Sequence, residues 1–298
     1  MNRRVEMVQY PRVPEKRNRI SMNNMTALTS RQAAAFRATV YDYYKRHGRR
    51  FPWRETTDPY RIFVSEVMLQ QTQAPRVLWK YERFVRLFPD AATLAAASLH
   101  DVLGAWQGLG YNRRALALKQ SAELIVTLHG GIVPRDEETL VSLPGVGPST
   151  ARAVMAFAYN EPVILIETNI RAVFIHHFFP HEETVADSNL RPLIEKTLDQ
   201  KEPGRWYNAL MDYGTFLKKA HANPARRSSH HQRQSPFEGS VRQVRGAILR
   251  LILEKVQLSE PALIETLPFE SGLVAEIIEK LEREQIIFRE NGNISIAS

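Results

Sequence analysis

The sequence predicts a mainly α-helical protein that ends in a small winged-helix-like domain. Apolar residues recur at helical spacing from about Thr29 to Leu217, and short breaks between the patterns are marked by Gly or Pro. Residues 241–298 give three helical patterns and then two short β-rich runs around Asn291–Gly292, a dipeptide typical of hairpin turns. Three helices followed by a hairpin is the order of a winged helix.

Each helix of the 29–217 region has its own signal. Residues 31–48 are amphipathic and close on Gly48, while Asp58 as N-cap and Pro59 at the first position start the next helix. Further helical patterns cover residues 82–90, 98–110, 113–131 and 136–145. In the terminal domain the helical patterns are 241–256, 259–267 with Ser259 as N-cap, and 271–284.

Composition divides the chain into four segments. Residues 1–28 are polar and contain proline, so we expect them to be poorly ordered. The helical domain spans 29–217. Residues 218–240 hold five Lys or Arg and three His with no acid before Glu238, which favours a solvated basic arm. Residues 241–298 form the last domain, which we expect either to contact DNA or to act as a protein–protein adapter.

The balance of charges indicates a polyanionic partner, with nucleic acid first. The chain has 298 residues, a net charge of +8 and no cysteine. Without cysteine, disulfides, zinc–thiolate sites and cysteine-ligated iron–sulfur clusters are excluded. No apolar stretch reaches the length of a membrane span and the N-terminus lacks a secretory pattern, so we expect a cytoplasmic monomer.

The string LPGVGPST at residues 143–150 stands between two helical patterns. Gly145 and Gly147 permit a tight turn, and Pro148 suits the first position of the following helix. A helix start of this kind presents backbone N–H groups, which favours a phosphate near Thr150. An ordinary helix hairpin is the alternative, because G-x-G alone is a weak signal.

Longer motifs give a specific resemblance. FPWR at 51–54, PYRIFVSEVMLQQTQ at 59–73, AWQGLGY at 105–111, LPGVGPSTARAV at 143–154 and TNIRAV at 168–173 occur in one order. This series resembles the adenine DNA glycosylase MutY family of the helix-hairpin-helix base-excision superfamily, which includes endonuclease III. The resemblance covers about Phe51 to Leu217 and implies a two-lobed helix-hairpin-helix glycosylase fold that binds double-stranded DNA.

The resemblance implies two catalytic carboxylates. An N-glycosylase flips a base out of the duplex, protonates it and stabilises a cationic sugar, and these tasks call for an acid and a fixed negative charge. Glu66, among apolar residues, matches the acid, and its burial would raise its pKa. Glu167 stands where the family has Asp. For the helix that follows Glu167, we expect Thr168 or Asn169 as N-cap.

Further roles follow from the resemblance. Asn169 would orient the acid or the sugar. Ser149 occupies the hairpin position where bifunctional relatives carry a nucleophilic Lys, which implies base excision without strand cleavage. Residues that would fill the gap left by the flipped base are Gln70 and Gln71. Those that would line the base pocket are Trp53 and Arg54.

Besides Glu167 in place of Asp, the sequence departs from the family at three places. Tyr111 begins the GLGYY motif, but Asn112 replaces the second Tyr, which in the family lies beside 8-oxoguanine. The spacing of the four cluster cysteines falls on Lys218, Ala225, Ser228 and Gln234. The tail reads as a winged helix where the family has a Nudix-like domain.

We therefore expect no iron–sulfur cluster. We expect no other metal centre either, because His221, His230 and His231 lack neighbouring acids or cysteines. Binding of a monovalent cation by the hairpin 143–150 is compatible with the sequence. The basic segment can instead reach DNA phosphates through Lys218, Lys219, Arg226 and Arg227.

Three functions remain open from the sequence. The first is a monofunctional DNA glycosylase that acts on adenine opposite guanine or 8-oxoguanine. The second is a uracil or thymine glycosylase at G mismatches. The third is a non-catalytic DNA-binding regulator, against which the pair of acids at Glu66 and Glu167 argues, because a binder needs neither.

Overall fold

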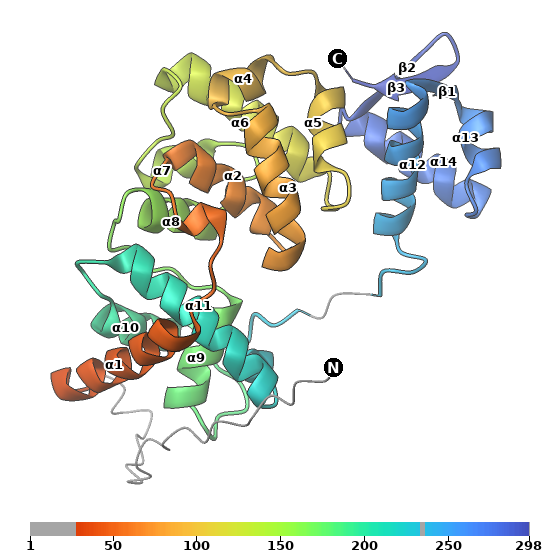
Figure 1. The fold of residues 1–298 in the computed structure, drawn as a ribbon. Helices are drawn as coiled ribbons and strands as arrows, with labels where there is room; N and C mark the ends of the chain where they lie inside the picture. Colours follow the sequence, from red (N-terminus) through yellow and green to blue (C-terminus); the bar gives the residue numbers. More distant parts are fainter. Residues whose placement is uncertain (1–27, 233–235, 298) are drawn as a thin grey trace, which may run out of the picture.

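The computed structural model describes residues 28–232 and 236–297. It has two helical lobes, each with its own apolar core, and a small domain that continues the core of the first lobe (Figure 1). This confirms the mainly α, two-lobed fold predicted from the sequence. Within the described ranges no helix is both long and apolar enough to cross a membrane.

The first lobe is built from the consecutive elements between Pro52 and Ala158. Asp58 accepts hydrogen bonds from the N–H groups of Tyr60 and Arg61 and so starts α2 next to Pro59, as predicted. The buried side chains of this lobe include Trp106, Phe63 and Phe84. Its elements are η2 (Pro52–Arg54), α2 (Pro59–Leu69), α3 (Ala74–Leu87), α4 (Ala91–Ala96), α5 (Leu99–Trp106), α6 (Arg113–His129), α7 (Glu137–Ser142) and α8 (Pro148–Ala158).

The second lobe joins the first helix of the chain to three later ones. Its elements are α1 (Ser30–His47), α9 (Thr168–Phe178), α10 (Asp187–Thr197) and α11 (Pro203–Ala220). Thr29 and Gln32 form a capping box at the start of α1, which ends at Gly48. Trp206 and Phe174 lie fully buried in the core between these helices. Because α1 packs on α10 and α11, the polypeptide must leave this lobe after Gly48 and return to it at α9.

The segment after α11 is folded onto α9, which corrects the expectation of a solvated arm over 218–240. Helix α11 continues to Ala220, and η3 (Pro224–Arg227) follows. Val185 exchanges backbone hydrogen bonds with Arg227 and Ser229. The Arg227 guanidinium donates to the carbonyl oxygens of Phe179, of Glu182 at 2.7 Å and of Ile175 at 3.4 Å. The carbonyl of Phe179, the C-cap of α9, thereby gains a donor, whereas that of Ile175 also accepts from the Phe179 N–H.

The terminal domain has the order of elements predicted for a winged helix. Its elements are α12 (Val241–Lys255), β1 (Gln257–Ser259), α13 (Glu260–Thr266), α14 (Ser271–Arg283), β2 (Ile287–Glu290) and β3 (Asn293–Ile296). The strands form an antiparallel sheet in the order β1-β3-β2. The hairpin between β2 and β3 turns at Asn291 and Gly292, with φ of 51° and 77°. Strand β1 was not predicted, because three residues carry too short a pattern.

Polar contacts fix the terminal domain against the first lobe beside the loop that follows α5 (Figure 1). Glu284, at the end of α14, accepts from both Nη atoms of Arg245 at 2.9 and 2.6 Å and pairs with Arg113 of α6 at 2.8 Å. Arg242 of α12 donates to the Tyr111 hydroxyl at 3.1 Å. These contacts lie next to an apolar core shared by the two units, so α12 has a defined place beside the Tyr111 loop.

We predict that Arg227→Ala lowers the free energy of unfolding by about 1–3 kcal/mol, because it leaves the partly buried carbonyl of Phe179 without its donor. Urea denaturation of the whole chain measures this. Arg226→Ala is the matched control, since Arg226 is exposed and its guanidinium has no partner among the described residues; its effect should stay within about 0.5 kcal/mol. Equal effects of the two variants would refute a capping role for Arg227.

Candidate active site

The first carboxylate comes from the first lobe. Glu66 lies in the last two turns of α2 and is half-buried. Among the described residues its carboxyl group has no hydrogen-bond partner and no ion pair, so its oxygen atoms are available to a ligand. Burial first, and then the negative charge of Glu167, raise the pKa of Glu66 to about 7, against the lowering effect of the Arg54 guanidinium. A carboxyl group with this pKa is in part protonated at neutral pH, as a general acid must be.

The second carboxylate arrives on an extended segment that α11 holds in place. The Tyr207 hydroxyl accepts from the N–H of Leu165 at 3.0 Å and donates to the carbonyl of Val163 at 2.7 Å. Leu165 itself is buried in the second core. Within the part of the chain that the structure describes, the extended segment before Glu167 is not paired with another strand, so its backbone groups need other partners. The Tyr207 hydroxyl supplies two of them. The position of Glu167 is therefore set by α11 as well as by its own segment.

Glu167 is itself the N-cap of α9, which corrects the expectation of Thr168 or Asn169. Its Oε1 accepts from the backbone N–H groups of Asn169 at 2.8 Å and Ile170 at 3.1 Å. Its Oε2 accepts from the Asn169 side-chain amide at 3.2 Å. One oxygen is thus held by the helix start, and the other is steered by a single amide. Capping and a catalytic use of the acid are compatible, because they employ different oxygen atoms.

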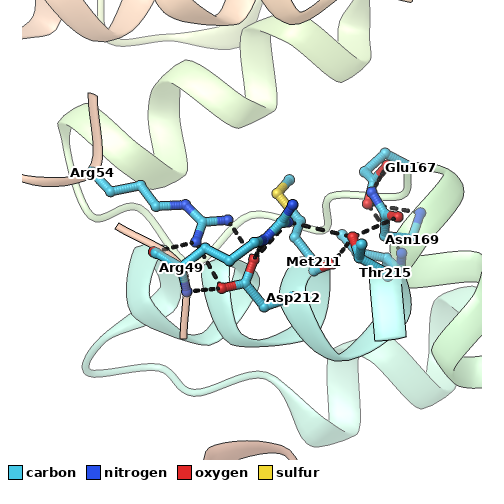
Figure 2. A network of polar contacts seen from close by, with 8 residues as sticks. Arg49, Arg54, Glu167, Asn169, Met211, Asp212 and Thr215 are labelled. Atoms are coloured by element: carbon cyan, nitrogen blue, oxygen red, sulfur yellow. Dashed lines mark hydrogen bonds and ion pairs between the residues drawn. The ribbon is translucent and has the colours of Figure 1, made fainter. Parts of the chain in front are cut away.

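Asn169 links this acid to α11 (Figure 2). The Thr215 hydroxyl lies 3.3 Å from Asn169 Oδ1 and 2.8 Å from the carbonyl of Met211. A Cβ atom at Gly214 would clash with the carbonyl oxygen of Asn169, so only Gly allows α11 to approach the first turn of α9 this closely. The expected orienting role of Asn169 thus has a geometric basis in its hydrogen bonds on both sides.

A buried carboxylate ties the two lobes together below this site (Figure 2). Asp212 of α11 has a side chain that is 1% exposed, and it accepts from the backbone N–H and Nε of Arg49, both at 2.7 Å. It also accepts from both Nη atoms of Arg54 at 2.9 and 3.0 Å. Four hydrogen bonds compensate the desolvation of this charge. Arg54, expected in the base pocket, thus lies near Glu66 but is held by Asp212.

Trp53 has a different place from the one expected. Its ring is 6% exposed, stacks on Phe51 at 4.8 Å between centroids and meets Tyr81 edge to face at 5.3 Å. The indole is thus committed to the core of the first lobe, and the expectation of a base-pocket wall is corrected for this residue. The reason is that FPWR forms η2, which turns Trp53 inward while Arg54 faces α11.

The hairpin between α7 and α8 lies beside the end of α2. Gln70 Nε2 donates to the carbonyl of Gly145 and to the Thr150 hydroxyl, both at 3.1 Å. Gly145 has φ of +74°, and Gly147 is the N-cap of α8 without a side-chain hydrogen bond. Ser149 is exposed in the first turn of α8. First-turn N–H groups without intrahelical partners are suited to a phosphate.

The other residues expected to contact DNA lie in two loops with left-handed backbone conformations. Gln71 is exposed with φ of +52°, an uncommon conformation for a residue with a side chain. Tyr111 has φ of +49°, and its ring lies under the guanidinium groups of Arg114 and Arg242 at 5.4 and 5.8 Å. Asn112 starts α6 without a side-chain cap. Strain at exposed tips is common where a chain must present a side chain to a ligand.

The residues at the four positions where the family has its cluster cysteines cannot bind an iron–sulfur cluster. Lys218, Ala225 and Ser228 offer no thiolate, Gln234 lies outside the described residues, and the whole chain has no cysteine. Nor do the described ranges contain a group of three or more His, Cys, Asp or Glu arranged for a metal ion. The site residues therefore do not fit an iron–sulfur cluster, and this loop is held by the backbone bonds of Val185 and the contacts of Arg227.

The other cations of this segment are distributed unevenly. Lys218 lies one turn after Thr215 on α11; burial, and then Arg49, lower its pKa while the charge of Glu167 raises it, with a net lowering. Lys219 and Arg226 are exposed. Arg227 is bonded to backbone carbonyls, which corrects the expected phosphate contact for that residue.

Sequence reasoning missed the residues of α11 that support the two acids. Asp212 carries a signal that could have revealed it, because a carboxylate stands among buried apolar positions of an amphipathic helix and so needs a partner. Gly214 and Tyr207 carry no such signal. Their roles depend on which helix lies opposite, and this information is tertiary.

Two lobes, a hairpin between helices and a half-buried acid facing a fixed carboxylate define a base-excision protein. Residues 64–196 match the family model described as HhH-GPD superfamily base excision DNA repair protein. The adenine DNA glycosylase of Mycobacterium tuberculosis (strain CDC 1551 / Oshkosh) is 37% identical over 230 residues, covering 70% of this chain and 76% of that relative. That of Mycolicibacterium smegmatis is 32% identical over 253 residues, covering 75% and 86%.

Solved structures agree on the fold. A thermostable thymine-DNA glycosylase has a TM-score of 0.56 and 26% identity, covering 63% of this chain and 88% of that one. An endonuclease III–DNA covalent intermediate has a TM-score of 0.52 at 21% identity over 70% and 91%, which supports the fold alone. The chain belongs to the adenine DNA glycosylase family within this superfamily, which confirms the resemblance drawn from its motifs.

We predict that Gly214→Ala slows base excision by about 10- to 100-fold, because moving α11 away from Asn169 displaces Glu167 by a fraction of an ångström to an ångström. Overpacking should also cost about 1–3 kcal/mol of stability. Single-turnover rates and urea unfolding measure the two effects. Gly104→Ala, where an added Cβ meets nothing within 4 Å, is the control and should stabilise α5 by about 0.5–1 kcal/mol. A wild-type rate in Gly214→Ala would contradict the positioning role.

Proposed function

We propose that this chain is a DNA glycosylase that hydrolyses the N-glycosidic bond of adenine mispaired with guanine or 8-oxoguanine in double-stranded DNA. The observation that carries the proposal is the pair of acids from separate lobes, with Glu66 near a pKa of 7 and Glu167 fixed at the start of α9. Relatives named adenine DNA glycosylase support the choice of base. The enzyme acts as a cytoplasmic monomer.

In the proposed reaction the flipped adenine lies between the lobes. Glu66 gives its proton to a ring nitrogen of the base, and the electrons of the glycosidic bond pass to the base as the bond breaks. The sugar then carries positive charge at C1′, which the Glu167 carboxylate stabilises. Water adds to C1′ and loses a proton to the Glu66 carboxylate, which restores the acid and leaves an abasic site.

The remaining contacts extend this proposal. Gln70 and Gln71 would enter the space left by the flipped base, and Tyr111 and Asn112 would face the opposite strand. Backbone groups near Gly145, Gly147 and Thr150 would hold a phosphate, with a monovalent cation on hairpin carbonyls in 143–150. Further phosphates would meet Lys218, Lys219 and Arg226. With the hydroxyl of Ser149 in place of an amine, no Schiff base forms there and the strand is left intact.

Excision of thymine or uracil opposite guanine is the second candidate. The similarity to a thymine-DNA glycosylase structure and the presence of Asn112 in the GLGY loop favour it. The scaffold is the same for both reactions. The difference lies in the base that Glu66 protonates.

We predict an alkali-labile product from labelled duplexes that contain A opposite 8-oxoguanine or G, and no cleavage before alkali. Duplexes with T or U opposite G are the comparison substrates. Product from these alone would replace the first candidate by the second. Absence of product from every duplex would exclude a glycosylase, and cleavage without alkali would exclude the monofunctional assignment.

We predict that the single-turnover rate is constant below neutrality and falls as the pH rises through about 7, since the Glu66 carboxyl group must carry a proton to act as an acid. Glu66→Gln should lower the rate by about 10²- to 10⁴-fold and keep DNA affinity. Fluorescence anisotropy with a labelled mispaired duplex measures that affinity. A Glu66→Gln enzyme with the wild-type rate and pH profile would remove Glu66 from the mechanism.

A further inference from the structure

The terminal domain does not present the surface through which a winged helix usually meets DNA. Helix α14 is in the position of the recognition helix. Its cap and its outer face carry Glu270, Glu276, Glu279 and Glu282, and Lys280 is paired with Glu276 at 2.5 Å. In the wing, Arg289 is paired with Glu260 and Glu282, both at 3.2 Å. Against these four glutamates, α14 carries only Lys280 and Arg283, so its surface is net acidic. A net acidic helix repels a phosphate backbone, and a wing whose Arg289 is already paired attracts it little.

Helix α12 carries two cations, Arg242 and Arg250, where it faces the first lobe. A groove of about 810 Å³ separates α12 from α3 and from the loop that follows α5. Its charged lining consists of Arg76 and Lys80 from α3, Arg242 and Arg250 from α12, and one acid, Glu254. Four cations against one carboxylate leave the groove strongly basic.

Two of these cations are held by uncharged groups. Arg76 donates through Nε to the carbonyl of Gly108 at 2.8 Å, and Arg242 to the Tyr111 hydroxyl, so each is aimed by a neutral partner. In the described ranges, Lys80 and Arg250 form no ion pair. Burial and Arg83 both lower the pKa of Lys80, as expected where like charges gather. Such crowding is relieved by an anion.

We propose that this groove holds the phosphate backbone of the duplex that flanks the mispair, with α12 rather than α14 as the DNA-contacting helix. The proposal rests on the proposed function and adds a second contact region to it. DNA is the occupant that continuity favours, since Gly108, Gly110 and Asn112 line the groove and belong to the loop that carries Tyr111. A strand bound at the active site can therefore pass directly into the groove.

Trp79 provides a reporter for this surface. It precedes Lys80 on α3, one turn after Arg76, and so stands at the edge of the groove lining; it is 79% exposed, whereas Trp53, Trp106 and Trp206 are buried. The chain has 4 tryptophans, so iodide quenching reports mainly on Trp79. A duplex that reaches the groove should protect it. Trp79→Phe should abolish the change in quenching.

The test compares a duplex that extends several helical turns beyond the mispair with one that spans only its nearest neighbours. For the long duplex, Lys80→Ala and Arg250→Ala should each reduce the slope of log affinity against log salt by about 1, and the double variant by about 2. The short duplex should bind all variants alike, and the single-turnover rate at saturating enzyme should not change. Trp79 should be protected by the long duplex only.

Two controls separate this outcome from damage to the fold. Arg250→Lys keeps the charge and should keep the wild-type slope. Arg31→Ala removes an exposed charge from α1 in the second lobe and should leave the slope unchanged.

Wild-type slopes in Lys80→Ala, Arg250→Ala and their double variant would overturn the groove proposal, and excision by the wild type would leave the proposed function standing. Competition by polyglutamate that depends on Arg250, together with unchanged DNA slopes, would assign the groove to an acidic protein and also overturn it. If no duplex is cut after alkali treatment but the slopes change as expected, the proposed function fails and the groove stands.

Discussion

The site depends on one carboxylate that meets two demands at the same helix start. Glu167 accepts hydrogen bonds from the first N–H groups of α9, and in the proposed reaction it also faces the sugar of a bound nucleotide. Its two oxygen atoms divide these demands, because Oε1 takes both backbone N–H groups and Oε2 takes one amide from Asn169. A side chain fixed by three hydrogen bonds loses little freedom on substrate binding, which is the condition for electrostatic stabilisation of a transition state.

Helix α11 makes this arrangement possible and connects it to the first lobe. Gly214 lets α11 approach Asn169, and Tyr207 fixes the segment that delivers Glu167. Three residues before Thr215, Asp212 binds Arg49 and Arg54 from the segment that leads to α2. Since Arg54 lowers the pKa of Glu66 and Asp212 holds Arg54, the same helix influences both acids. The lobes are thus coupled by charge as well as by packing.

Much of the fold could be predicted because its signals are local. Asp58 with Pro59, Gly48, Ser259 and the Asn291–Gly292 turn all lie where chain chemistry places helix starts, helix ends and hairpins. The motifs also predicted that Glu66 and Glu167 act together, and in the structure the charge of Glu167 does raise the pKa of Glu66, while their catalytic roles stay a prediction. The cap at Glu167 was missed because Glu is a poorer N-cap than the Thr and Asn that follow it, and only the packing of α9 on α11 selects it. The inward turn of Trp53 and the role of Arg227 likewise depend on contacts made by residues distant in sequence.

Two of the departures from the family lie next to each other in the structure. Asn112 ends the GLGY loop, and Arg242 of the terminal domain binds Tyr111 in the same loop. A smaller side chain at 112 and a different domain behind it are therefore two parts of one altered surface. The loop after α11 is a separate case, in which Arg227 binds the carbonyls of Phe179 and Glu182 in the segment where the resemblance places four cysteines. Glu167 is a further departure, since the family has Asp there, but its hydrogen bonds come from α9 alone and involve neither of these two surfaces.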